Sequence, residues 1–248
     1  MIKKLFENIG NFFQMLWIVF SKPEKWSVFR KRVFDEIEII GINSISLVGI
    51  MSVFIGAVIA LQVGFNMDNP LLPEYTIGYL TRSTTILEFS PTIMSLILAG
   101  KVGSNISSEI GTMKTTEQID ALEIMGVNSL NYLVLPKITA AVIFFPILVI
   151  FSIGLSLIGG WLALIISDLG STESYIYGVR AFFKVKEVTY ALSKSVFFAF
   201  VIVSIASYYG YYTKVGAVEV GRSSTEAVVT NSIAVLILDL ILTQLILF

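Results

Sequence analysis

Long apolar runs alternate with short polar segments along this chain. A helix needs about 20 residues to cross roughly 30 Å of hydrocarbon, and five of the runs are long enough. The pattern therefore predicts an all-α integral membrane protein with a five-span membrane domain over residues 37–248. The second run is the weakest, because Arg82 and Glu88 lie within it. The expected spans are Ile39–Phe65, Tyr75–Ser104, Ile138–Ile166, Val188–Tyr212 and Ala227–Phe248.

The first 36 residues mix aromatic side chains with Lys and Arg. On a helix, one side would carry Leu5, Phe12, Phe13, Leu16 and Phe20. Amphipathic segments of this kind lie in the membrane interface with their apolar side toward lipid. We therefore expect an interfacial amphipathic segment over residues 1–36, divided by a turn at Ser21–Trp26. The alternative is a cytosolic helix packed on its own protein.

A charged segment, Ser107–Val127, separates the second and third expected spans. Thr115 is a candidate N-cap with Gln118 as its capping-box partner, and Gly126 suits the C-terminal end of a helix. A helical projection separates acidic from apolar residues. One side carries Glu117, Asp120 and Glu123, with Ile124 among them, and the other carries Ile119, Leu122 and Met125. We expect the apolar side to pack on the bundle and the acidic side to meet another protein. A solvated loop without a partner is the alternative.

Composition supports the membrane assignment and removes several kinds of chemistry. Of the 248 residues, 55% are hydrophobic and 14% are charged, whereas an ordinary soluble domain has about 25% charged residues. The net charge of −1 provides no basic field for nucleic acid. Cys and His are both absent from the sequence, which removes thiolate metal sites and the commonest general base. We therefore expect a chain that is not an enzyme and binds no metal or nucleic acid.

The sequence also lacks a phosphate-binding P-loop. The nearest string is "LAGKVGS" at residues 98–104. Val102 stands where a Ser or Thr must hold Mg²⁺, and Ser95 replaces the first glycine of the motif. We expect no cofactor in this chain, so energy must come from a partner or from an ion gradient.

The distribution of Lys and Arg predicts the orientation in the membrane. If the N-terminus is cytoplasmic, twelve of the 17 basic residues fall on the cytoplasmic side and five on the other. Five spans then put the C-terminus outside and the charged segment in the cytoplasm.

Three charged residues lie within or at the edge of the apolar spans: Glu88, Lys194 and Asp239. A charge at the bilayer centre costs at least about 2.5–3.5 kcal/mol, so such groups pair or line a wet cavity. We expect them to form a polar cluster. Its role is either to hold an outward gate or contact a lipid headgroup, or to fix helix packing as a static pair.

Several motifs together resemble the MlaE/YrbE permease family, the membrane subunits of MCE-associated lipid ABC transporters. The longest is "AGKVGSNISSEIGTMKTTEQIDALEIMGV" at residues 99–127, followed by "LPK" at Leu135–Lys137. Others are "KSVFFAF" at Lys194–Phe200, "GAVEVGRSSTEAVV" at Gly216–Val229 and "LD" at Leu238–Asp239. Lys101 and Lys137 stand where the family usually has Arg, and "LEFSP" at Leu87–Pro91 lacks the usual Arg before the Glu. Arg82 could replace that Arg in the intramembrane polar cluster.

The resemblance implies a homodimeric permease in the bacterial inner membrane, over residues 37–248. A cytoplasmic ABC ATPase, which holds ATP and Mg, would dock on a coupling helix at about residues 107–127. A periplasmic MCE-domain protein would be a further partner. The cargo would be phospholipid or a related lipid. The implied ATPase-coupling residues are Glu109, Gly111, Thr112, Met113, Glu117, Asp120, Ala121, Glu123 and Gly126. Candidates to line the lipid cavity are Leu61, Gln62, Phe65, Tyr79 and Ile86.

Other interpretations remain open from the sequence. One is a secondary transporter driven by ions through the three intramembrane charges, and another is a membrane scaffold without transport. The stretch Thr213–Val229 is either a second ATPase contact or a loop that enters the fifth span.

Overall fold

The computed structural model describes residues 2–20, 25–66 and 73–247, and in these ranges the regular secondary structure is helical throughout. Part of the turn expected at Ser21–Trp26 lies outside the described residues. In chain order the elements, with π-helical stretches labelled η, are α1 (Ile2–Val19), α2 (Trp26–Glu36), η1 (Ile37–Ile42), α3 (Asn43–Phe65), α4 (Thr76–Thr84), η2 (Thr85–Ile93), α5 (Met94–Leu98), η3 (Ala99–Gly103), α6 (Ser104–Thr115), α7 (Gln118–Ile124), α8 (Ser129–Ser167), α9 (Thr172–Arg180), α10 (Val185–Tyr211) and α11 (Ala217–Leu247).

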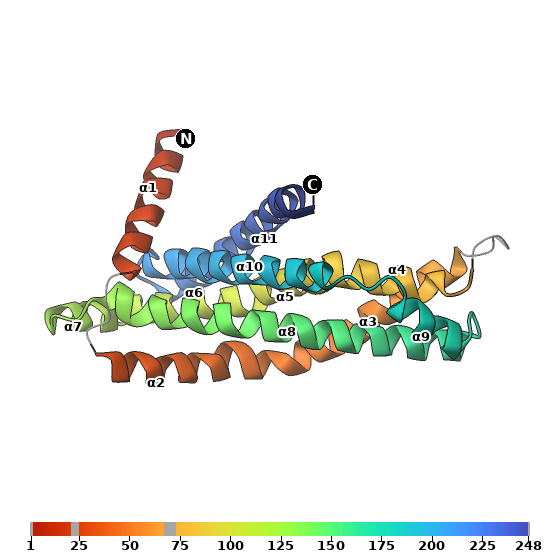
Figure 1. Cartoon of the computed structure of the whole chain (residues 1–248). Coiled ribbons are helices and arrows are strands. Elements are labelled where there is room, and N and C mark those ends of the chain that lie inside the picture. Colours follow the sequence, from red (N-terminus) through yellow and green to blue (C-terminus); the bar gives the residue numbers. More distant parts are fainter. Residues whose placement is uncertain (1, 21–24, 67–72, 248) are drawn as a thin grey trace.

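Within the described residues, five continuous helical stretches are long and apolar enough to cross a membrane, which confirms the all-α membrane architecture. They run side by side in an elongated bundle (Figure 1). We name its ends by the short helices found there, the α7 end and the α9 end. The five stretches are Trp26–Phe65, Thr76–Thr115, Ser129–Ser167, Val185–Tyr211 and Ala217–Ile246.

The helices extend beyond the expected spans, mostly at the α7 end. The third begins at Ser129 rather than Ile138, because its first turns are polar but still pack on the bundle. The last begins at Ala217, so Gly221 and Thr225 belong to a helix. The expectation of a loop running to Val229 was therefore wrong. The hydropathy pattern identified the apolar parts of these helices and missed their polar extensions.

Close packing of the first and third spans rests on small residues. Gly56 in α3 and Gly159 in α8 lie so close to the opposite helix that a Cβ on either would overlap a backbone carbonyl, that of Ser156 or of Val53. Small residues allow membrane helices to approach in this way. A buried hydroxyl chain adds to the contact: Ser52 donates to Ser152 (2.9 Å), which donates to Ser90 of the second span (3.1 Å).

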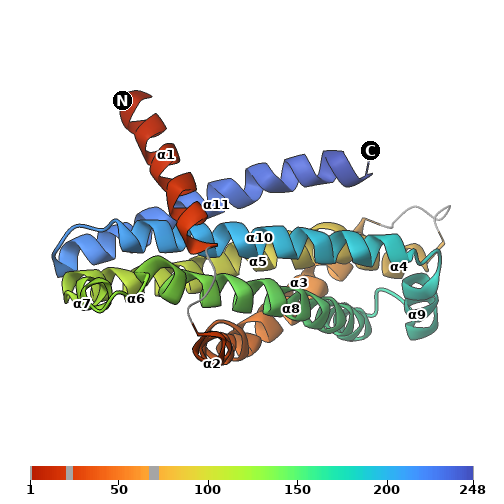
Figure 2. The ribbon, with the colours of Figure 1, turned by 60° about the vertical axis from the view of Figure 1, so that its left-hand side comes forward.

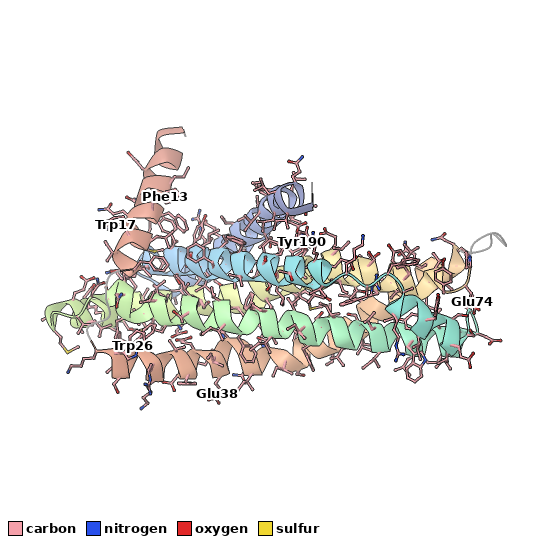
Figure 3. The ribbon with its side chains drawn as sticks, viewed as in Figure 1. Phe13, Trp17, Trp26, Glu38, Glu74 and Tyr190 are labelled. Atoms are coloured by element: carbon pink, nitrogen blue, oxygen red, sulfur yellow. The ribbon has the colours of Figure 1, made fainter. Side chains whose placement is uncertain are left out.

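The N-terminal helix α1 leaves the bundle near its α7 end and crosses it at a steep angle (Figures 1 and 2). Met15 and Val19 are fully buried against the bundle, whereas Trp17 is 85% exposed and Phe13 65% exposed. The exposed aromatics labelled in Figure 3 therefore face away from the protein. This is the pattern of an interfacial helix, which buries one side on its protein and offers aromatic rings to the headgroup region.

The α9 end is closed by a short helix that the hydropathy pattern did not predict. Ser171 caps α9 by accepting a hydrogen bond from the Ser174 amide (3.2 Å), and Glu74 accepts one from the Ser174 hydroxyl (3.0 Å). The Tyr175 hydroxyl donates to the carbonyl of Leu157 in α8 (3.0 Å). Burial raises the pKa of that hydroxyl above its usual range, so it remains a donor at neutral pH. These contacts tie α4, α8 and α9 together.

Candidate functional sites at the α7 end and in the bundle

The charged segment Ser107–Val127 forms two helices, not the single one expected. Its first part continues the second span as α6, and only Gln118–Ile124 forms the separate helix α7. Thr115 lies inside α6 and donates to the Thr112 carbonyl (3.0 Å), so it is not the N-cap. The chain turns at Glu117, whose φ of 60° is left-handed. Helices α6 and α7 are therefore separated by a turn at this end of the bundle.

The end of α7 follows the sequence prediction. Gly126 has a φ of +77°, a conformation that costs little only without a side chain. The Gly126 amide donates to the Glu123 carbonyl (2.9 Å) and the Val127 amide to the Leu122 carbonyl (3.0 Å). Together these bonds form a Schellman motif. The motif fixes the direction in which the chain leaves α7 toward α8.

The apolar side of α7 packs on the bundle as predicted for two of its three residues. Ile119 is fully buried and Leu122 packs against the hydrophobic core. Met125 is 68% exposed and Ile124 is 87% exposed, so placing Met125 on the buried side was wrong. Helix α7 ends at Ile124, and the turn that follows rotates Met125 outward. The tip therefore presents two large apolar side chains to the surroundings.

Two of the acidic residues are held within the protein. Asp120 pairs with Lys114 of α6 (2.7 Å). Glu123 accepts hydrogen bonds from the Ser129 hydroxyl of α8 and the Tyr211 hydroxyl of α10, each at 2.9 Å. These contacts fix α7 on three neighbouring helices. A force applied to α7 would therefore be transmitted to α6, α8 and α10.

The predicted coupling residues divide into an outer and an inner group. On the surface lie Thr112, Glu117, Ala121, Glu123 and Gly126. Asp120 is half-buried. Met113 is also half-buried and packs against the hydrophobic core. Gly111 is buried against Thr213 and Val220. Glu109 is exposed as well, so the predicted residues open to a partner lie on both α6 and α7. Ile124 is exposed at the same tip, on the acidic side where the helical projection placed it, but the predicted coupling set did not include it.

Glu109, whose side chain is 42% exposed, contacts a buried Lys137–Glu36 ion pair, and the sequence did not predict this ionic node. The Lys137 ammonium lies 2.8 Å from Glu109 Oε2 of α6 and 2.6 Å from Glu36 Oε1 of α2. The Lys137 side chain is 1% exposed and that of Glu36 is 8% exposed. The node joins the first three spans through α2, α6 and α8. An acid in the polar segment before the first span gave no sequence signal that it would be buried.

The three intramembrane charges come together as predicted. The Lys194 ammonium lies 2.6 Å from Asp239 Oδ1 and 3.0 Å from Glu88 Oε2. The Thr92 hydroxyl donates to Asp239 Oδ1 (2.9 Å), and the Tyr190 ring faces the ammonium at 4.5 Å. The Lys194 side chain is fully buried, whereas that of Glu88 is 41% exposed. The cluster thus joins three spans and is open on its Glu88 side.

Arg82 does not belong to this cluster, which corrects the prediction. Its guanidinium donates to the carbonyls of Val179 (2.9 Å) and Ala181 (2.7 Å) at the end of α9, and lies 3.7 Å from Glu187. One helical turn and more separates it from Glu88 along α4 and η2. Arg82 therefore stabilises the α9 end. It does not take the place of the Arg that the family usually has before Glu88.

The five candidate cavity residues do not share one surface. Ile86 is buried between spans with Val149 and Ala191, so it cannot line an open cavity in this conformation. Phe65 is 74% exposed and Gln62 is also exposed. Tyr79 packs edge-on against Phe182 (6.0 Å between ring centroids), and Leu61 is half-buried. Cavity residues depend on how helices face one another, which hydropathy alone does not determine.

Two of the π-helical stretches, η2 and η3, lie in the second span and each contains a charged residue. Glu88 and Pro91 lie in η2 (Thr85–Ile93), and Lys101 lies in η3. Proline lacks the amide that a regular helix would use, and π-turns inside helices occur frequently at functional sites. The second span is therefore irregular where it carries its charge.

These features define a multi-pass α-helical membrane protein with an ionic cluster among its spans and a rigid, exposed helix at one end. The sequence matches the family described as Permease MlaE over residues 33–245. The chain belongs to the MlaE permease family and is an ABC transporter permease.

Curated relatives match along nearly their whole length. A probable ABC transporter permease protein of Rickettsia typhi is 34% identical over 244 residues, covering 98% of this chain and 93% of the relative. A probable ABC transporter permease protein of Pyropia yezoensis is 32% identical, covering 97% and 90%. The intermembrane phospholipid transport system permease protein MlaE of Haemophilus influenzae is 30% identical over 241 residues, covering 94% and 89%.

Proposed function

We propose that this chain is the membrane subunit of an ABC transporter that moves phospholipid or a related lipid between membranes. A separate cytoplasmic ATPase supplies the energy, and a periplasmic MCE-domain protein receives or delivers the lipid. The chain works as a homodimer in the bacterial inner membrane and contributes no nucleotide-binding motif of its own. The observation that carries the proposal is helix α7, which is exposed at its tip and held by ionic and hydrogen bonds to three spans.

The ATPase would bind the α7 tip through Ile124 and Met125 and through the exposed acids, Glu117 and Glu123. Buried apolar anchors provide most of the energy in protein interfaces, and the tip offers two such side chains at 87% and 68% exposure. Asp120 and Glu123 bind residues of α6, α8 and α10. A displacement of α7 by the ATPase would therefore move the ends of these helices. This is the mechanical requirement for coupling ATP hydrolysis to transport.

The lipid would enter near the Lys194 cluster. Helix α11 diverges from α10 toward its C-terminal end (Figure 2), and the partly exposed Glu88 carboxylate lies on the open side of the cluster. A second copy of the chain would enclose this region and complete an apolar cavity with polar groups beside it. Such a cavity suits acyl chains and a headgroup. The N-terminus and α7 would be cytoplasmic and the C-terminus periplasmic, as the distribution of Lys and Arg predicts.

The test is purification followed by reconstitution. The tagged chain, extracted in mild detergent, should bring down a P-loop ATPase, and transfer of labelled phospholipid from reconstituted vesicles should require ATP. If the chain purifies alone and moves substrate in response to a proton gradient, an ion-driven secondary transporter is the correct interpretation. If it binds partners but lipid never moves, the chain is a scaffold.

A further inference from the structure

A groove at the α7 end lies on the side of α8 that faces α2. It has a volume of about 320 Å³ and is lined by residues from α2, α7 and the first turns of α8. This volume is at the lower end of the range of about 300–1,000 Å³ typical of small-molecule sites. Phe29, Leu122 and Val127 supply much of the apolar lining. The groove is well separated along the bundle from the Lys194 cluster.

Two cations give the groove a positive character. Lys25 and Arg32 both line it, and none of the described residues that line it is acidic. The Arg32 guanidinium carbon lies over the Tyr132 ring, 3.9 Å from the centroid, and the guanidinium donates to the Tyr132 carbonyl (2.8 Å). The nearby acid Glu36 is paired with Lys137 (2.6 Å) and does not line the groove. The Tyr132 contacts therefore position the guanidinium, and its other N–H groups can donate to a ligand.

The groove lies at the level where the interfacial helix meets the bundle. Asn131 lines the groove and also donates its side-chain amide to the Val19 carbonyl at the end of α1 (2.8 Å). Trp26 begins α2 at this end (Figure 3) and is 63% exposed, stacked on Phe29 with 5.2 Å between ring centroids. Tryptophan is enriched at the membrane–water interface. The groove thus opens where phospholipid headgroups lie.

We propose that this groove binds an anionic phospholipid, with its phosphate at Lys25 and Arg32 and the start of one acyl chain against Phe29, Leu122 and Val127. Basic pockets between spans near the cytoplasmic surface bind anionic headgroups in this way, and guanidinium and phosphate form paired hydrogen bonds. Because α7 supplies one wall, a bound lipid would stabilise α7 against α2. The site is separate from the Lys194 cluster. Met125 lines it and is also a proposed contact of the ATPase, so lipid binding is measured first without the ATPase and does not depend on transport.

The binding test uses the full chain in mild detergent and native mass spectrometry with added phosphatidylglycerol or phosphatidylcholine of the same acyl chains. Wild-type protein should retain phosphatidylglycerol preferentially. The double variant Lys25→Gln/Arg32→Gln should weaken that binding about tenfold or more, because each basic residue near a headgroup contributes on the order of 1 kcal/mol. The matched control Arg30→Gln/Lys31→Gln changes the same net charge on the same helix at exposed positions outside the groove. It should change binding less than about twofold.

A second pair of variants covers the case in which loss of Arg32 loosens α2. Val28→Trp would fill the groove while keeping both cations, and it should also weaken phosphatidylglycerol binding. Phe34→Trp, at a 68% exposed position of the same helix, should not. Equal losses in the groove and control variants would overturn the proposal in favour of diffuse surface attraction. Release of the lipid on addition of the ATPase would also overturn it, because the groove would then belong to a protein partner.

Discussion

The Lys137 ammonium lies 2.6 Å from the Glu36 carboxylate, in a contact that is nearly closed to solvent. Glu109 meets the same ammonium at 2.8 Å from the second span. One buried cation therefore joins the first three spans. Lateral packing between membrane helices is apolar and permits small sliding motions, whereas an ionic node fixes register. We infer that this node fixes the relative positions of α2, α6 and α8.

Replacing Lys137 with Met should destabilise the protein by about 3–5 kcal/mol, because a buried Glu36 carboxylate would lose its counter-charge. Thermal unfolding in detergent, followed by circular dichroism, measures the effect. The matched control is Lys114→Met, which removes the same charge from a pair with Asp120 whose side chains are 31% and 48% exposed. Exposed pairs contribute about 0–1 kcal/mol.

The double variant Lys137→Met/Glu36→Gln should recover part of the lost stability, because the carboxylate that lacked a partner would be neutral. An unchanged melting temperature in Lys137→Met, or equal losses in Lys137→Met and Lys114→Met, would contradict the burial of the Lys137–Glu36 pair within the protein.

Replacing Glu88 with Ala should separate transport from stability. The cluster has two carboxylates and one ammonium, so a neutral Lys194–Asp239 pair at 2.6 Å remains. Because the Glu88 side chain is 41% exposed, we expect a stability change within about 1 kcal/mol and a transport rate lower by about tenfold or more. ATP-dependent lipid transfer by the reconstituted complex measures the rate.

The comparison variant Lys194→Ala leaves two carboxylates without their cation and should unfold more readily, by about 3–5 kcal/mol. Normal transport in a correctly assembled Glu88→Ala protein would show that the cluster only fixes helix packing.

Replacing Gly159 with Ala should separate the first and third spans, because the new methyl group would overlap the Val53 carbonyl. Overpacking of this kind costs about 1–3 kcal/mol. Gly154 of the same helix has open space around its Cα, so Gly154→Ala should be neutral or stabilising by about 0.5–1 kcal/mol. Melting temperatures of the two purified variants test the difference. Similar behaviour of both variants would contradict the close approach of α3 and α8.

Sequence reasoning predicted what depends on local pattern. Apolar runs located the five spans, and Gly126 located the end of α7 because its left-handed φ follows from glycine chemistry. The meeting of Glu88, Lys194 and Asp239 followed from the cost of isolated charges in lipid. In each case one residue or one run carries the physical reason, so no knowledge of the tertiary structure was needed.

The missed features depend on which helices become neighbours. Glu36 looks like a surface acid until α8 brings Lys137 beside it. Ile124 was placed on the acidic side of α7, where it is 87% exposed, but it was left out of the coupling residues because its apolar character broke the pattern. Arg82 was assigned to the wrong partner because α9, whose carbonyls it binds, has no hydropathy signal. A resemblance between sequences conveys the existence of such contacts without giving their geometry.

The central claim is that the α7 tip is held by an ATPase on the cytoplasmic side, and site-directed cross-linking tests it most directly. The natural chain has no cysteine, so Ile124→Cys at the tip and Ile166→Cys at the α9 end, positions 87% and 84% exposed, each carry one thiol. We predict that a short thiol–amine cross-linker joins the Ile124→Cys variant to the ATPase and leaves the Ile166→Cys variant unlinked. Labelling of the cysteine at position 124 by an impermeant maleimide from the periplasm, or its failure to cross-link in the active complex, would contradict the account.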